Sequence, residues 1–130
     1  MKAIVLVLSS LLAAASAAAA EAERSVPVLV GGNGDLDACL SMAEVSGVRT
    51  SLAVRSGPGV SYPQRDALKQ GSHVHVCDGP SNALWTPIVY APAGSDGDCG
   101  VSHPIPAKGP YRGACKTGWV RSRWLSVVAG

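Results

Sequence analysis

The sequence predicts an all-β fold, and three observations lead to this prediction. After residue 20 the apolar residues recur in short segments, some of which alternate strictly with polar residues. Glycine and proline account for 15 and 9 of the 130 residues, and they cluster between these segments. No stretch after residue 20 combines the length and the period of an ordinary helix. A chain of this length has room for one domain.

Residues 1–20 are expected to form a signal peptide. An uncharged run of 18 residues ends at Ala20, and Ala18 and Ala20 form a small-residue cleavage site before Glu21. A retained membrane anchor is the alternative, because a run of this length nearly spans a bilayer. The second half of the run is alanine and serine, which are weakly hydrophobic, so cleavage is favoured. We therefore expect a periplasmic or secreted protein with no membrane span after cleavage.

The charge of the mature chain is nearly balanced. Removal of residues 1–20 takes away Lys2, which leaves 10 basic residues against 9 acidic ones, a net charge of +1. Binding to a phosphate backbone needs a strongly basic surface. The composition therefore predicts no nucleic-acid partner.

All four cysteines follow the signal peptide. An even number of cysteines in a short exported chain, with no Cys-x-x-Cys pair, predicts two disulfides rather than a zinc site. Cys99 and Cys115 flank most of a glycine- and proline-rich insertion at residues 91–116, so we favour this pair, which leaves Cys39 to join Cys77. Four cysteines allow three connectivities, and the other two stay open.

Residues 21–38 are expected to be a linker or N-terminal arm. Pro27 and the cluster Gly31-Gly32-Asn33-Gly34 interrupt a short apolar patch, which favours a flexible tether. The domain itself is then expected to occupy residues 39–130.

The first two strands are expected at residues 39–48 and 51–55. The second strand stops at Gly57-Pro58-Gly59, because proline presets the first central φ of a turn and glycine accepts a positive φ at the second. Tyr62 precedes a proline, which keeps its backbone extended.

The segment around Val74 and Val76 alternates cleanly, which predicts a strand with both valines inward and with His73 and His75 outward. Cys77 shares the face of the histidines, and three such ligands on one face would suit a metal. The alternative is two exposed polar residues beside a disulfide-bonded cysteine, a pattern that alternation alone produces. We expect the alternative, and therefore no metal and no cofactor.

The next strand is expected at residues 84–90. Pro87 cannot donate a hydrogen bond to a ladder, so this strand is expected at a sheet edge or with a bulge. Residues 91–116 follow as the long insertion that two cysteines constrain. The segments at 118–120 and 124–128 return to strand and close the domain.

Five segments, in this order, resemble the motifs of the bacterial SH3 domain family. The resemblance extends over roughly residues 48–127, and its most specific part is the first motif. The segments are Leu52-Ala53-Val54-Arg55-Ser56-Gly57-Pro58-Gly59, Leu68-Lys69-Gln70-Gly71 with Val74-His75-Val76, Trp85 to Ile88, Lys116-Thr117-Gly118-Trp119-Val120, and Trp124-Leu125-Ser126.

The resemblance implies a small, partly open SH3-like barrel of five to seven strands. It also implies a non-catalytic binding or targeting module, often directed at cell-wall peptide or glycan or at other proteins. The chain departs from the family pattern at Ala53, which replaces an asparagine, at Pro87, and in the length of the insertion at residues 91–116.

The aromatic residues suggest where a ligand would bind. Tyr62, Trp85 and Trp119, with Arg121 beside them, are candidates to line a shallow groove for an extended peptide. The alternative is that the tryptophans fill the core of a domain that has no phenylalanine. For Trp85 and Trp119 together, the sequence favours neither interpretation.

Catalysis is not expected. A cysteine nucleophile needs a free thiol beside a base, and the one local candidate is Cys99 with His103. The even number of cysteines argues against a free thiol. The sequence thus predicts an exported binding module for envelope peptide or peptidoglycan, and its alternative is an interaction subunit of an envelope complex that acts through residues 91–116.

The signal peptide can be tested by mass spectrometry of the exported protein. We expect a mass that begins at Glu21, because signal peptidase cleaves after the small residues at Ala18 and Ala20. A membrane-bound species that retains Met1 would contradict the prediction.

Overall fold

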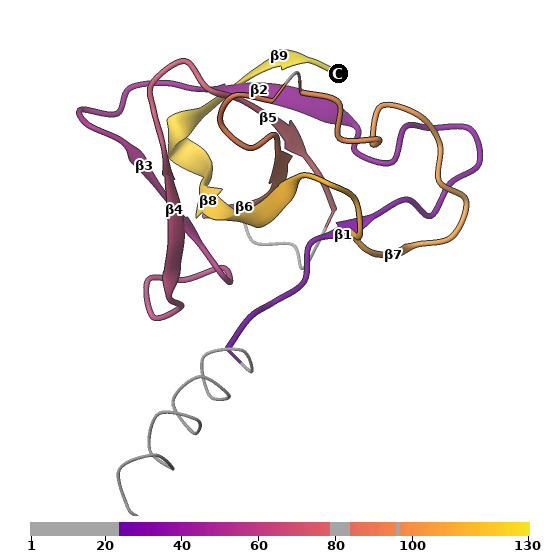
Figure 1. Ribbon diagram of the computed structural model, residues 1–130, viewed down its shortest axis with the longest axis horizontal. Coiled ribbons are helices and arrows are strands. Elements are labelled where there is room, and N and C mark those ends of the chain that lie inside the picture. The colour runs from indigo at the N-terminus through magenta and orange to yellow at the C-terminus, as the bar shows by residue number, and fades with distance from the viewer. Residues whose placement is uncertain (1–23, 79–83, 96) are drawn as a thin grey trace, which may run out of the picture.

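A computed structural model describes residues 24–78, 84–95 and 97–130 (Figure 1). The expected signal peptide lies outside these residues. The described part of the chain is all-β, and its one helical segment is the 3₁₀ turn η1 at Ser122–Trp124. The predicted fold class is therefore confirmed at the level of secondary structure.

The described part of the chain contains nine strands, most of them four to six residues long. The first and seventh have two residues each. In chain order they are β1 (Leu29–Val30), β2 (Ser41–Val45), β3 (Leu52–Arg55), β4 (Gln64–Leu68), β5 (His73–Val76), β6 (Trp85–Tyr90), β7 (Gly109–Pro110), β8 (Lys116–Arg121) and β9 (Leu125–Ala129).

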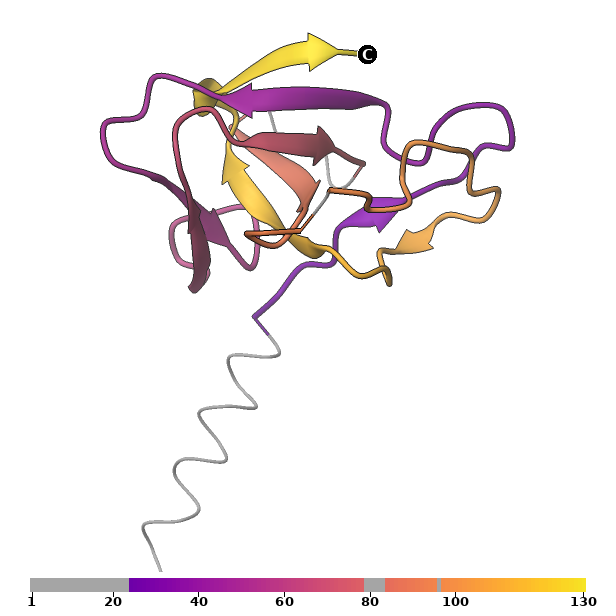
Figure 2. The ribbon, with the colours of Figure 1, turned by 45° about the horizontal axis from the view of Figure 1, so that its top comes forward.

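Seven of the strands form one antiparallel sheet in the order β4-β3-β8-β6-β5-β2-β9, and β1 pairs with β7 in a separate ribbon. The register shifts inside the β2–β9 and β3–β4 pairs. Such irregularities increase the local twist, and the sheet curls strongly (Figure 2). Its two edges, β4 and β9, do not pair with each other, so the described residues form no closed barrel.

The concave face of the sheet holds the first of two apolar cores. Alternation along the strands places one side chain in two on this face, and β-branched valines and isoleucine fill it. We call it the inner core; its buried residues are Ala43, Val45, Leu52, Val54, Val74, Ile88, Tyr90 and Val120.

The opposite face of the sheet is also covered, by the N-terminal arm and the insertion. Pairing of Pro87 with Trp119 and of Trp85 with Arg121 places these side chains on the face away from Ile88 and Val120. We call this second cluster the outer core; its buried residues are Val28, Val30, Ala38, Cys39, Trp85, Val89, Cys99, Val101 and Trp119.

The arm is not the flexible tether that its glycines and proline suggested. Val28 and Val30 are 2% and 5% exposed, and the arm bonds to the insertion through its backbone, with Ala38 N–H donating to the His103 carbonyl at 2.9 Å. The two segments lie side by side on one side of the sheet in both views (Figures 1 and 2). The physical reason is that the apolar residues of the arm alternate as in a strand and bury one face on the sheet.

The arm and the insertion together form the cover of the outer face. One disulfide joins this cover to the sheet, and the other links two parts of the cover. Cys39 is bonded to Cys77, which ties the arm to the end of β5, and Cys99 is bonded to Cys115, which closes the insertion. The predicted pairing is confirmed. Two disulfides are compatible with an oxidising compartment. Among the described residues, no helix has the length and hydrophobicity needed to cross a membrane.

Pro87 does not lie at a sheet edge as predicted. Strand β6 is interior, between β8 and β5. The Pro87 carbonyl accepts a hydrogen bond from Cys77 N–H at 3.0 Å, on the β5 side, just beyond the last residue pair of that ladder, Val76 with Ile88. The N–H that proline lacks would point to this same side. Proline therefore cannot donate the reciprocal bond to Cys77, and this single missing bond falls at the end of the ladder.

Gly118 permits the close packing of β3 on β8, and its replacement tests this contact. A Cβ at Gly118 would lie 2.2 Å from Val54 Cγ1, and Val54 is completely buried. We expect Gly118→Ala to lower the free energy of unfolding by about 1–3 kcal/mol, because the buried valine has no space to move into.

The matched control is Gly109→Ala, another strand glycine, where an added Cβ would meet nothing within 4 Å. We expect it to change the free energy of unfolding by less than about 0.5 kcal/mol. Urea denaturation of both variants measures the difference. Equal losses in the two variants would contradict the packing explanation.

Candidate binding groove

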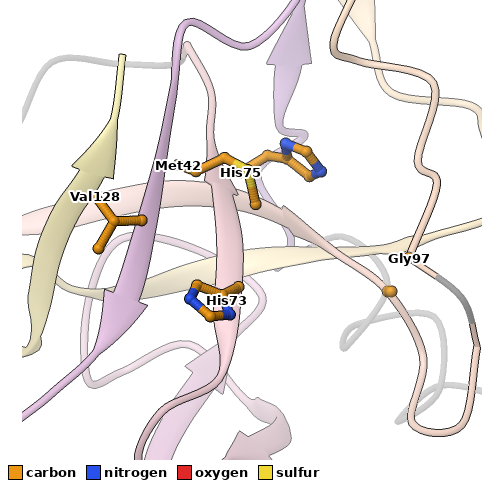
Figure 3. A pocket seen from close by; sticks show the side chains of 6 residues that line it. Met42, His73, His75, Gly97 and Val128 are labelled. Atoms are coloured by element: carbon orange, nitrogen blue, oxygen red, sulfur yellow. The ribbon is translucent and has the colours of Figure 1, made fainter.

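The outer face of the sheet is left open beyond the edge of the cover, where β2, β5 and β9 lie next to one another. A hollow of about 540 Å³ occupies this place, and Figure 3 shows its lining residues, of which five are labelled. His73 and His75 come from β5, and β9 and the insertion supply the walls. The lining residues are Met42, His73, His75, Ala91, Gly97 and Val128.

A second hollow of about 400 Å³ adjoins the first and shares His73 and Ala91 with it. The first hollow lies on the outer face of β5, whereas the second lies at the rim of the inner face, to which Tyr90 belongs. We call the two hollows together the groove. Its further lining residues at the β4 end are Asp66, Ala67, Leu68, Lys69, Ser72, Tyr90, Ala93 and Lys116.

The groove has two chemically different ends. At the β9 end Met42 and Val128 supply apolar surface. At the β4 end the Asp66 carboxylate accepts hydrogen bonds from the Tyr90 hydroxyl at 2.9 Å and from Lys116 Nζ at 3.3 Å. A ligand that fits both ends must itself be partly apolar and partly polar.

The polar end is held in one ionisation state. The pKa of Asp66 lies below its ordinary value, chiefly because the backbone N–H of Ala67 donates to the carboxylate, with further help from Tyr90 and Lys116 and with burial opposing. Burial, followed by the bond to Asp66, raises the pKa of the Tyr90 hydroxyl. At neutral pH the site therefore presents a fixed carboxylate and a neutral phenol.

The two histidines differ in exposure, which corrects the expectation that both face solvent. His73 is open, with 58% of its side chain exposed, and its Nε2 lies 4.0 Å from a Glu44 carboxylate oxygen. His75 points to the same outer face but is only 8% exposed, because the insertion extends over it. Burial lowers the pKa of His75, and the negative charge of Asp98 in the insertion offsets part of that effect.

Cys77 does not join the histidines as a ligand. Its sulfur is bonded to Cys39, so no thiolate is present on this strand. Within the described residues no group of three or more histidine, cysteine or acidic side chains is placed to hold a metal ion.

The predicted aromatic groove is not open in the structure. Trp119 is 0% exposed and Trp85 is 7% exposed. The arm covers both, and Trp119 Nε1 donates to the Val26 carbonyl at 2.9 Å. The core alternative therefore describes the two tryptophans correctly, since the arm occupies the face that a peptide would have used.

Tyr62 and Arg121 also serve the packing of the fold. A Cβ at Gly57 would lie 2.5 Å from the Tyr62 ring, so the tyrosine rests directly on the glycine of the turn. The Arg121 guanidinium lies over the Trp85 ring, 4.9 Å from its centroid, in a cation–π contact. Arg24 covers the Tyr62 ring in the same manner, at 5.9 Å.

The local candidate for catalysis is also absent. The sulfur of Cys99 is bonded to Cys115, so it is no nucleophile beside His103.

Sequence reasoning missed most residues of the groove. Asp66, Tyr90 and Lys116 come from β4, β6 and β8, and the sheet register alone brings them together. The one available signal was the outward position of His73 on its strand. The chain matches no known protein family, no curated protein and no solved structure at a significant level.

The burial of His75 predicts how stability depends on pH. The folded pKa is below the ordinary value of 6.5, so the unfolded chain takes up the proton first as the pH falls. The stabilising contribution is therefore complete above pH 6.5 and is lost at lower pH. We expect the melting temperature to fall between pH 7.5 and pH 5, before the carboxylates titrate.

The variant His75→Gln is expected to flatten this part of the pH profile, because glutamine takes up no proton. The exposed His103 supplies the control, and His103→Gln should keep the slope of the parent protein. Thermal melts at a series of pH values measure both. A parent and a His75→Gln variant with parallel profiles would refute the assignment to His75.

Proposed function

We propose that this protein is an exported, non-catalytic SH3-like module that binds envelope peptide or peptidoglycan in the groove between β4 and β9. The seven strands of the sheet agree with the five to seven strands that the resemblance implies. The glycines of the resembling motifs also have clear structural roles, since Gly57 accepts the Tyr62 ring and Gly118 accepts Val54.

The observation that carries the proposal is that two neighbouring hollows share His73 and Ala91 as lining residues. An extended chain fits a long, shallow depression that offers apolar contact at one end and hydrogen-bonding groups at the other. Stem peptides of the cell wall are short and combine apolar and charged groups, so they match this lining in kind.

Export is supported by the covalent structure. Both disulfides are formed, and such bonds persist in the periplasm and outside the cell. Together with the expected cleavage at Ala20, this favours a periplasmic or secreted protein.

A second candidate function is that of an interaction subunit of an envelope complex, acting through residues 91–116. It is favoured by another hollow, of about 450 Å³, between the arm and the insertion, where Leu36 is 51% exposed. Lys108 of the insertion pairs there with Asp78. This surface lies apart from the groove, so the two functions separate by mutation.

Retention on purified cell-wall sacculi tests the first function. We expect the parent protein to be retained and His73→Ala to weaken binding by about 1–2 kcal/mol, because the imidazole lies at the junction of the two hollows. Since His73 is 58% exposed, its replacement should leave the melting temperature nearly unchanged.

The control is His103→Ala, which removes an exposed histidine outside the groove and should bind as the parent does. Equal retention of both variants would exclude the groove as the binding site. Absence of retention for the parent protein would favour the interaction subunit instead.

A further inference from the structure

The β4 end of the groove carries more positive than negative charge. A further hollow of about 370 Å³ lies there, and it shares Asp66, Tyr90 and Lys116 as lining residues with the second hollow. Arg65 lines the smaller hollow, and Lys69 lines the second one. Among the described residues that line these two hollows, Asp66 is the one acid. The lining therefore holds three cationic side chains and a single carboxylate.

The carboxylate of Asp66 has little capacity left for a ligand. Its Oδ1 accepts a hydrogen bond from Ala67 N–H at 2.8 Å. Its Oδ2 accepts from the hydroxyl of the buried Tyr90 at 2.9 Å and from Lys116 Nζ at 3.3 Å. A carboxylate offers about four acceptor positions, and three of them are taken. Asp66 therefore serves to position Lys116 and is a poor partner for a cationic ligand.

The cationic side chains, in contrast, keep most of their donors. Lys116 Nζ has three N–H bonds, of which Asp66 takes one. Within the described residues the Arg65 guanidinium, which has five N–H bonds, uses one of them in a long hydrogen bond of 3.5 Å to the Thr117 carbonyl. Both side chains are exposed to solvent. The site therefore offers positive charge and unused donors, but few free acceptors.

The fold brings these two cations to the same place. Arg65 reaches from the edge strand β4 to the backbone of Thr117, which follows Lys116 in β8. Lys116 reaches back to Asp66, which follows Arg65 in β4. Two like charges are thus held near each other with one carboxylate to reduce their repulsion. A second negative group bound beside Asp66 compensates the charge that remains.

We propose that the β4 end of the groove is a carboxylate-binding site, at which Arg65 and Lys116 hold a carboxylate of the peptide ligand. The inference deepens the proposed function and rests on it, since that function supplies the peptide. An arginine fork and an ammonium group both bind carboxylates through short, charge-assisted hydrogen bonds. The lining of the smaller hollow has two positive charges and one negative charge, a net charge of +1, which one carboxylate neutralises.

The remaining lining favours a peptide over a phosphate polymer. Beside the cations, the second hollow presents the small apolar side chains of Ala67, Ala91 and Ala93. Short apolar side chains of a peptide bury surface against such a lining. A phosphate polymer is polar along its whole length and gains little there. The juxtaposition of two cations and small apolar groups therefore matches a short peptide that carries a carboxylate.

Titration of the nitrogen-15-labelled parent protein with small peptides tests the site, with amide chemical shifts as the readout. The probes are N-acetyl-Ala-Ala-Ala with a free carboxylate, its C-terminal amide, and N-acetyl-Ala-Glu-Ala amide, whose one carboxylate belongs to a side chain. We expect the free acid to shift the resonances of residues 65–69 and 116–117 and to bind at least about tenfold more tightly than its amide. The glutamate probe distinguishes a side-chain carboxylate from a terminal one.

The variant Arg65→Gln should weaken binding of the free acid by about tenfold and leave binding of the amide unchanged, because it removes one charge. Arg65 is exposed and its hydrogen bond is long, so the melting temperature should stay at that of the parent. Arg65→Lys keeps the charge without the fork and should bind the acid with intermediate affinity. The matched control is Arg123→Gln, which removes an exposed arginine from η1, beyond the other end of β8 from Lys116, and should bind as the parent does.

Three results would overturn the proposal. The first is a parent protein whose resonances none of the peptides shifts, and the second is equal binding of the free acid and its amide. The third is a free acid that binds the parent and Arg65→Gln alike. Inorganic phosphate that shifts the same resonances and binds more tightly than the free acid would assign the site to phosphate groups instead.

Retention on sacculi separates this test from that of the proposed function. A parent that is retained but does not prefer the free acid contradicts the carboxylate site alone. A parent that prefers the free acid but is not retained contradicts the proposed function and leaves the site to a carboxylate from another peptide.

Discussion

The burial of Trp119 is the interaction on which the rest of the structure depends. Its indole lies on β8 near the middle of the sheet and has no exposed surface. The single polar atom of the ring, Nε1, donates to the carbonyl of Val26, 93 residues earlier in the chain. A buried indole N–H without a partner would be costly, so the outer core forms fully only when the arm is in place. The sheet, the arm and the insertion therefore behave as one folded unit.

The parts of this fold that could be predicted from the sequence rest on local chemistry. Alternation around Val74 predicted the position of β5, and β3 ends before Gly57-Pro58-Gly59 as expected. The expected positive φ is wrong for both glycines of this turn, and Gly57 is instead needed because the Tyr62 ring leaves no room for a Cβ. The disulfide pairing followed from the compartment and from the flanks of the insertion. Exposure could not be predicted in the same way. A strand that alternates between polar and apolar residues is compatible with solvent or with a second layer on its outer face, and His75 and Trp119 are buried because that second layer exists.

The groove could not be predicted from the sequence for a related reason. Asp66, Tyr90 and Lys116 are spread over three strands, and none of them belongs to a motif with its own chemistry. Their meeting depends on the register, which pairs Tyr90 with Lys116 across β6 and β8 and places Asp66 within reach of both. A change of register by one residue would send these side chains to the other face. The meeting of these three side chains is therefore a property of the assembled sheet, and no short segment of the sequence predicts it.

The position of the groove follows from how thin the cover is. The ribbon that joins arm and insertion consists of two residue pairs, β1 with β7, and the buried side chains that the cover contributes are mostly small. Such a layer buries little apolar area, so each disulfide adds stability at a place where packing alone is weak. Disulfide bonds hold the cover in place at Cys39–Cys77 and at Cys99–Cys115. Gly97 lies at the margin of the cover, where it lines the open hollow. The outer face of β2 and β5 is therefore left open beside a wall that the second disulfide holds in place, and this is the combination of open surface and rigid border that a binding groove needs.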